Sequence, residues 1–414
     1  MMQTMNREEG GTPSRISIGN WIWAFVIIVG WSALMFAGGW LARMAFSPTD
    51  YRSDHSLDTS YSHAVFDEAW SRVKENFLGT VPSDTVREYG AIRGALATLN
   101  DRFTFFTEPP VRTVDKEHMR GSFGGIGVNL SINDAGEIVL MPLADGPAAR
   151  AGVQAGDILI SIDGVPLPKP AKVDDATRVR GEVGTTVVVE VRRLSQTQKF
   201  SITRATIEVP SVNARVITTT VNARPVAVGY IQITSFTERT GKEVQDALKA
   251  LNSGSQQSQG YLIDLRDNGG GLLSAAVDVA SEFVSDGAIV YEKKRDEPEI
   301  AFSVKNSRTK IADGKPMAVL INKDTASAAE IVAGAIQDDK RGMLIGQKSY
   351  GKGSVQLVFD LRDGSAVRVT IAKWLTPKRR ALDGVGLTPD IVADGAPEAQ
   401  LSQAVNTVVA NIKN

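Results

Sequence analysis

The chain has 414 residues, of which 43% are hydrophobic and 22% charged, and its formal net charge is −1. This length predicts two or three domains. The balanced charge, with no block of lysine and arginine, argues against a nucleic-acid-binding protein. The chain has no cysteine, which excludes disulfides and a cysteine nucleophile. Its three histidines are scattered, so we expect no metal site and no cofactor.

An uncharged stretch near the N-terminus predicts a membrane anchor. Residues 21–42 read WIWAFVIIVGWSALMFAGGWLA, and at about 1.5 Å per residue a helix of this length crosses a hydrocarbon layer of roughly 30 Å. Tryptophans lie near both ends, as interfacial aromatic residues do. A cleaved signal peptide is the alternative, but its apolar core is usually about 7–15 residues long. We therefore expect a short tail (1–20), an uncleaved single-pass anchor (21–43) in the cell inner membrane, and a large extracytoplasmic, periplasmic part.

Residues 44–62 are polar and predict a linker, and residues 63–112 predict a helical segment. Apolar residues recur every four positions from Val65 to Phe77 and at helical spacing from Ile92 to Leu99. An aromatic turn, LNDRFTFF at 99–106, closes this helical unit.

Residues 113–208 predict a small β-rich domain. Short β-like runs are separated by glycine- and aspartate-containing turns. The expected strands are 126–132, 138–143, 158–162 and 187–191, with one short helix at 146–152.

Residues 209–395 predict an α/β core, because strands and helices alternate there. The expected strands are 226–233, 260–265 and 317–321, and the expected helices are 240–251, 272–284 and 327–336. A hairpin follows at 355–361 and 366–372, and residues 396–414 predict a C-terminal helix. The whole chain is thus expected to be a mixed α/β (α+β) multidomain protein.

Ser327 is the first candidate for chemistry. It lies in Thr325-Ala-Ser-Ala-Ala-Glu330, between a predicted strand and a predicted helix. Ser327 and Glu330 also fit a capping box, in which the serine only caps the helix. However, the small neighbours leave the hydroxyl accessible, and N–H groups at a helix start hold a developing oxyanion. Because all three histidines precede this region, a lysine is the expected base.

Lys352, in Tyr350-Gly-Lys-Gly-Ser-Val-Gln356, is the candidate base, and a solvated turn lysine is the alternative. The flanking glycines let another segment approach closely. In an extended strand Lys352 and Gln356 face one side, so the glutamine can orient the amine. A lysine base must be neutral, so its pKa must fall by several units from about 10.4 through burial.

Two glycine-containing segments were weighed as ligand sites. LRDNGGGLL at 265–273 follows a buried strand and exposes backbone N–H groups, although a plain turn is the alternative. GQKSYGK at 346–352 matches G-x-x-x-x-G-K. Gly353 stands where a phosphate-binding loop needs serine or threonine, so no nucleotide site is expected.

Together these segments resemble the C-terminal processing peptidases, or tail-specific proteases, a family of serine peptidases with a Ser–Lys dyad. The resemblance covers residues 63–395. It is carried by DTASAAEIVAGAIQD around Ser327, SYGKGSVQ around Lys352 and YLIDLRDNGGGLL at 261–273. The intervals of 25 residues from serine to lysine and of four from lysine to glutamine also fit the family.

The resemblance implies that Ser327 is the nucleophile, Lys352 the general base, and Gln356 the residue that positions the lysine. It also implies an oxyanion hole made by the backbone N–H groups of Ala328 and Gly270. The family commonly has proline where this chain has glycine at position 269, and this departure bears on the assignment of Gly270.

Residues 121–208 resemble a PDZ domain, so a PDZ-like β-domain is expected before the catalytic core. The loop Ser122-Phe-Gly-Gly-Ile-Gly-Val128 is similar to the loop that captures a peptide C-terminus. By that resemblance, the peptide carboxylate would be bound by the backbone of Gly124, Gly125, Ile126 and Gly127.

The resemblance therefore implies a membrane-anchored serine endopeptidase that recognises protein tails and cleaves through an acyl-enzyme. The implied partners are proteins or peptides with free C-termini and the membrane, but no nucleic acid. An adaptor protein or a second copy of the chain is left open. Two other functions also stay open: a PDZ adaptor with an inert core, and an acyl hydrolase for non-peptide esters.

Overall fold

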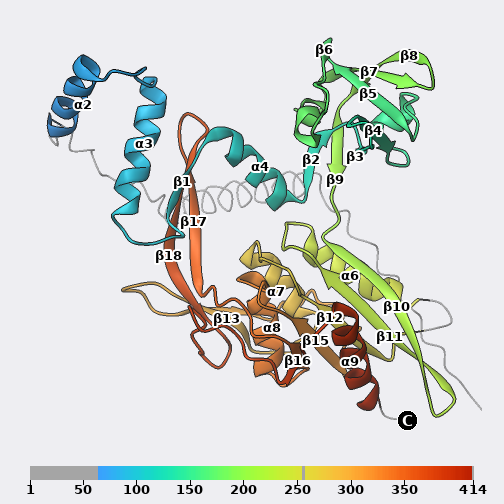
Figure 1. The fold of residues 1–414 in the computed structure, drawn as a ribbon. Helices are drawn as coiled ribbons and strands as arrows, with labels where there is room; N and C mark the ends of the chain where they lie inside the picture. Colours follow the sequence, from blue (N-terminus) through green and yellow to red (C-terminus); the bar gives the residue numbers. More distant parts are fainter. Residues whose placement is uncertain (1–63, 254–256, 413–414) are drawn as a thin grey trace, which may run out of the picture. The chain divides into compact units, whose positions relative to one another are not determined.

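The computed structural model describes residues 64–253 and 257–412 (Figure 1). The predicted tail (1–20), anchor (21–43) and linker (44–62) lie outside the described residues. In the part of the chain that is described, none of the helices has the length and apolar character needed to cross a bilayer. Residues 1–82 and 83–414 form two compact units, and each is described by itself.

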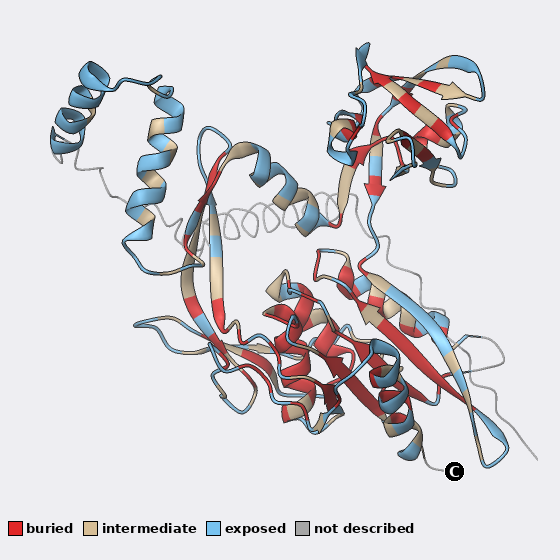
Figure 2. Cartoon of the chain, in the orientation of Figure 1, coloured by how far each residue is buried: buried red, intermediate tan, exposed pale blue. Residues whose placement is uncertain are grey.

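The predicted helical segment is confirmed by two helices, one in each unit. Helix α2 (Ala64–Asn76) carries the stacked rings of Phe66 and Trp70. Helix α3 (Asp84–Ala97) begins after Ser83, whose side chain accepts a hydrogen bond from a backbone N–H of the first turn. Neither helix contains a buried residue, as the exposed colouring in Figure 2 shows. The apolar spacing thus predicted the helices but not their burial.

A third helix leads into the β-rich domain. Helix α4 (Pro109–Arg120) ends at Gly121, whose φ of 69° suits glycine. The boundary predicted between residues 112 and 113 falls inside this helix. The domain is entered through β2 (Ser122–Gly125) and left through β9 (Ala205–Glu208), which pair antiparallel.

The sheet of this domain has the order β3-β4-β5-β7-β8, with β6 paired to β5. Alternating residues of the strands fill a separate apolar core. The elements are β3 (Val128–Ile132), β4 (Ile138–Pro142), α5 (Pro147–Arg150), β5 (Asp157–Ile162), β6 (Val165–Pro166), the 3-10 helix η1 (Val173–Val179), β7 (Thr186–Arg193) and β8 (Gln196–Thr203).

The α/β core contains a six-stranded sheet of order β10-β11-β12-β15-β16-β19. The β10–β11 pair is antiparallel and every later pair is parallel. The strands are β10 (Val212–Val221), β11 (Arg224–Ile233), β12 (Gly260–Asp264), β15 (Met317–Ile321), β16 (Met343–Gly346) and β19 (Ile391–Val392).

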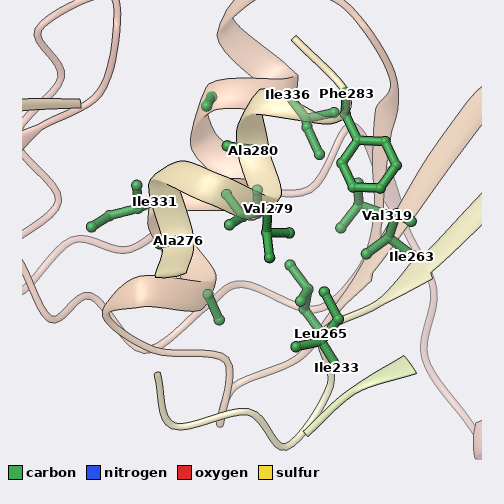
Figure 3. Close-up of a cluster of buried hydrophobic side chains, with 14 of the residues drawn as sticks. Ile233, Ile263, Leu265, Ala276, Val279, Ala280, Phe283, Val319, Ile331 and Ile336 are labelled. Atoms are coloured by element: carbon green, nitrogen blue, oxygen red, sulfur yellow. The ribbon is translucent and has the colours of Figure 1, made fainter. Parts of the chain in front are cut away.

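Helices cover both faces of this sheet. One face packs against α6 (Thr240–Leu251), α7 (Leu273–Ser281) and α8 (Ala328–Asp338), and Figure 3 shows part of the apolar cluster there. The other face packs against α9 (Pro397–Ala410), the predicted C-terminal helix. Strands β12 and β15 are buried along their whole length, which explains their continuous apolar sequences.

A second sheet carries the predicted hairpin. Its order is β1-β18-β13-β14, with β17 on the other side of β18. Because β1 pairs with β18, the aromatic turn at 99–106 lies beside the hairpin that contains Gln356. The strands are β1 (Phe105–Thr107), β13 (Ala288–Lys293), β14 (Ile300–Ser303), β17 (Ser354–Asp360) and β18 (Ala366–Leu375).

The parallel strands bring three predicted segments to one edge. The loop after β12 contains Gly270, the loop after β15 contains Ser327, and the loop after β16 contains Lys352. Neighbouring parallel strands end at the same edge of a sheet, and this edge is where open α/β sheets bind ligands. The topology therefore gathers residues separated by more than 80 positions.

Candidate active site

Ser327 lies directly before α8 in a strained backbone conformation, with φ 56° and ψ −118°. A residue that only caps a helix usually has extended backbone, and positive φ in a non-glycine residue concentrates at functional sites. The loop before it is held by buried Thr325, whose hydroxyl donates to the carbonyl of Leu265 at 2.8 Å. The carbonyl of Asn268 accepts from the N–H of Ala326 at 2.9 Å.

Glu330 joins the loop of Ser327 to the loop of Lys352. Its carboxylate is fully buried, and one oxygen accepts from the backbone N–H groups of Ser327 and Lys352, each at 2.9 Å. The other oxygen accepts from the Gly351 N–H at 2.7 Å and from the Ser349 hydroxyl at 2.5 Å. Since both nitrogens lie 2.9 Å from one oxygen, they are no more than 5.8 Å apart.

Lys352 is held by its backbone and partly buried by its surroundings. Its carbonyl accepts from the indole N–H of Trp374 at 2.9 Å. A Cβ added at Gly351 or Gly353 would lie within 2.7 Å of backbone atoms of the 382–386 segment. The predicted close approach of another segment is therefore observed. Burial first, and then the positive charges of Arg368 and Arg102, lower the pKa of Lys352.

Ser327 and Lys352 face one cavity of about 750 Å³, which Ala328, Gly270 and Gln356 also line. The predicted nucleophile, base and oxyanion residues thus come together. Within the described residues, no hydrogen bond joins the Ser327 hydroxyl to the Lys352 amine. The Nζ atom of Lys352 lies instead 4.9 Å from the centre of the Phe103 ring.

Gln356 lies on β17 and does not contact the amine. Its Nε2 donates to the Ser354 hydroxyl at 2.8 Å and to the Thr370 hydroxyl at 3.5 Å. Its Oε1 accepts no hydrogen bond from a described residue. That oxygen can therefore accept one from the Lys352 amine.

The two predicted oxyanion donors differ in their present engagement. Gly270 packs against Ser327, because a Cβ added there would lie 2.8 Å from the serine Cβ. Its N–H donates to the buried Asn268 side chain at 2.8 Å. The Ala328 N–H, at the start of α8, has no acceptor among the described residues. An oxyanion near Ser327 would meet Ala328 directly, whereas Gly270 would have to leave Asn268.

The PDZ-like domain has its own groove of about 400 Å³ between β3 and η1. Strand β3 is an edge strand, so its free side can pair with an extended peptide. Ile126 and Gly127 line this groove. Gly124 and Gly125 do not line it, because they belong to β2 and pair with β9. Of the four predicted loop residues, two therefore reach the groove.

Three contributors to these sites were missed from the sequence. The Glu330 link was recognised only as half of a capping box. Phe103 was read as part of an aromatic turn, with no signal that it would face Lys352. The helix η1 could have been suspected from its start, where the Asp175 carboxylate accepts from the Lys172 N–H at 2.7 Å.

Comparison with known proteins assigns both domains. The family model for peptidase family S41 matches residues 227–393, and a PDZ-domain model matches residues 138–193. A carboxyl-terminal-processing protease of Synechocystis is 33% identical over 383 residues, covering 90% of this chain and 87% of that protein. A carboxy-terminal-processing protease of Bartonella bacilliformis is 33% identical over 365 residues, covering 87% and 81%.

Among solved structures, a photosystem II D1 C-terminal processing protease matches with 32% identity and a TM-score of 0.46, covering 79% of this chain and 87% of that one. The chain is thus a serine-type peptidase. It belongs to peptidase family S41, among the carboxyl-terminal-processing proteases, as the resemblance of its sequence implied.

Replacing Glu330 with glutamine tests the link between the two loops. Glutamine puts an amide NH₂ where one carboxylate oxygen accepts two donors, and each mispaired buried donor costs about 1–3 kcal/mol. We expect kcat/KM for a peptide substrate to fall at least about 100-fold. The control is Asp338→Asn, which alters a buried carboxylate at the other end of α8 and should retain activity. Wild-type activity in Glu330→Gln would contradict the role.

Proposed function

We propose that this protein is a membrane-anchored endopeptidase that binds protein C-terminal tails through its PDZ domain and cleaves peptide bonds with a Ser327–Lys352 dyad. One observation carries the proposal. The strained Ser327 and the lysine whose pKa burial lowers face one cavity, and their backbones are tied to the same carboxylate oxygen.

The proposed reaction is acyl transfer. Neutral Lys352 takes the proton of the Ser327 hydroxyl as the serine oxygen attacks the scissile carbonyl carbon. The N–H of Ala328, joined by that of Gly270 once it leaves Asn268, would stabilise the oxyanion. The carbon–nitrogen bond then breaks, and Lys352 gives its proton to the leaving amine. Water attacks the acyl ester, its proton passes to Lys352, and the serine regains a proton as the acid is released.

For this reaction the lysine side chain must turn from Phe103 toward Ser327. The two backbone nitrogens are already no more than 5.8 Å apart, so rotation of the side chain is enough and the loops need not move. Gln356 offers its free Oε1 as the acceptor that would hold the amine there.

The PDZ groove supports recognition of tails. A peptide pairing with the free edge of β3 would bring its carboxylate to the Ile126–Gly127 turn at the start of that strand. The anchor rests on the sequence of residues 21–42, and the proposed location is the inner membrane with the catalytic domain in the periplasm.

Two substitutions test the dyad. Ser327→Ala and Lys352→Ala should each lower cleavage of a tailed peptide by at least about 1,000-fold, with the melting temperature retained. The matched control is Lys348→Ala, an exposed lysine in the same loop, which should cleave normally. Labelling of Ser327 by a fluorophosphonate provides a second readout. Near-normal cleavage by Lys352→Ala would remove the dyad, and tail binding without turnover by the wild type would favour an adaptor.

The pH profile tests the state of the base. Lys352 must be neutral to accept a proton, so activity should be lost as pH falls through its pKa. Because burial and neighbouring positive charges lower that pKa, kcat/KM should rise with pH through a midpoint below the ordinary lysine value of about 10.4. An activated ester, whose leaving group needs no proton, should show the same acid limb. A rate that is flat from about pH 6 to 10 would contradict a lysine base.

Fractionation tests the anchor. The full chain, expressed in a Gram-negative host, should stay in the membrane pellet after alkaline carbonate washing, because an uncharged helix of about 20 residues spans the bilayer. A variant lacking residues 1–43 should be released. In spheroplasts, added protease should digest the catalytic domain of the full chain. Release of the full chain by carbonate, or protection of that domain, would overturn the placement.

A further inference from the structure

The aromatic turn at 99–106 has no role in the reaction just described, yet it is built firmly against the base. Its Asp101 carboxylate accepts from the Phe103 N–H at 3.0 Å and from the Thr104 hydroxyl at 2.7 Å. The Thr104 hydroxyl accepts in turn from the N–H of Thr370 on β18 at 3.0 Å. Thr370 is also the residue that Gln356 faces across the hairpin. The turn is therefore fixed to the strand that supports the predicted positioning residue.

Two cations meet the ring of Phe103. The Nζ of Lys352 lies 4.9 Å from its centre, and the guanidinium carbon of Arg102 lies 4.6 Å from it. Arg102 also lies over the ring of Tyr350, at 5.5 Å. An aromatic face attracts an ammonium ion through its quadrupole, whereas the neighbouring guanidinium repels it. One half-buried ring thus holds the amine beside a charge that disfavours its protonated form.

We propose that the Asp101–Thr104 turn is a positioning element for the catalytic lysine: the Phe103 ring is the resting position of the Lys352 ammonium, and Arg102 destabilises that ammonium there. This inference rests on the proposed role of Lys352 as the base. Because the ring attracts the cation far more than the neutral amine, loss of the proton also frees the side chain to turn toward Ser327 and Gln356. Deprotonation and movement into the site are then coupled.

The other charged groups around Lys352 are accounted for by their own partners. Glu330 accepts four hydrogen bonds, Asp115 pairs with Arg368, and Asp383, beside Gly353, pairs with Lys373. Asp360 pairs with two basic residues of α4. None of these carboxylates forms an ion pair with the Lys352 amine in the described part of the chain. The remaining charged or titratable groups of the cavity are Arg112, Lys116, His118, Arg120, Glu238 and Arg368.

Arg368 acts in the same direction as Arg102 but is a less clean probe. Its charge also lowers the pKa of Lys352. However, it contacts Phe105 and Asp115, and its Nε is buried without a hydrogen-bond partner. Substituting it would disturb β1 and α4 as well. Arg102 is exposed, so its replacement should leave the fold intact.

The experiment is a direct titration of Lys352 by NMR, with ¹³C-labelled lysine and Lys352→Arg to assign the signal. Phe103→Leu removes the aromatic face and should lower the lysine pKa by about 0.5 unit or more, and Phe103→Tyr should restore it. Arg102→Gln removes the repulsion and should raise the pKa by about 0.3 unit or more, and Arg102→Lys should restore it. The acid limb of kcat/KM should move in the same directions.

Opposite shifts from two adjacent substitutions separate this role from mere loss of structure. The Arg102 shift should also shrink in about 0.5 M salt, because that charge is exposed. Equal pKa values in all variants, or shifts of one sign, would overturn the proposal. Should Phe103→Leu unfold, the Arg102 pair decides alone, and an unchanged pKa there overturns it. The NMR titration needs no turnover, so an active Lys352→Ala would remove the dyad without deciding whether Phe103 holds the ammonium.

Discussion

The buried carboxylate of Glu330 is the interaction on which the site depends. The sheet brings the loops after β15 and β16 to one edge, but an edge alone fixes no distance between two flexible loops. A charged acceptor with four donors does, because each N–H or O–H that it loses would be left unpaired in the interior. The carboxylate also holds the N–H of the strained Ser327, which helps to maintain a backbone conformation that is otherwise unfavourable.

This link has an electrostatic consequence for Lys352. A buried negative charge near a lysine would ordinarily favour the ammonium, which is the wrong form for a base. Here the carboxylate contacts the lysine through its backbone N–H, not through the amine, and its charge is spread over four hydrogen bonds. The amine itself faces an aromatic ring and two guanidinium groups. The chain therefore joins the catalytic loops with a carboxylate while surrounding the amine with groups that pull its protonation in opposite directions.

The sequence predicted most of the core because its signals are local. Buried strands such as β15 appear as continuous apolar runs, and helix α6 was predicted with its observed bounds. Ser327, Lys352 and Gly270 were found from spacing and small-residue context, and topology brought them together. Burial was predicted less well. Helix α2 has the apolar spacing of a packed helix but no buried residue, because periodicity reports a face and not what covers it.

What the sequence could not predict is the orientation of side chains across distant segments. Gln356 was expected to hold the lysine, yet in the structure its amide points its donor at Ser354 and leaves its oxygen free. The ring that the lysine meets belongs to Phe103, almost 250 positions earlier, and only the pairing of β1 with β18 brings it there. A hairpin that carries the positioning glutamine on one strand and anchors the resting position of the base on the other holds both destinations of one side chain. The choice between them then depends on a single proton, because the aromatic face binds the charged form and the amide oxygen accepts from either.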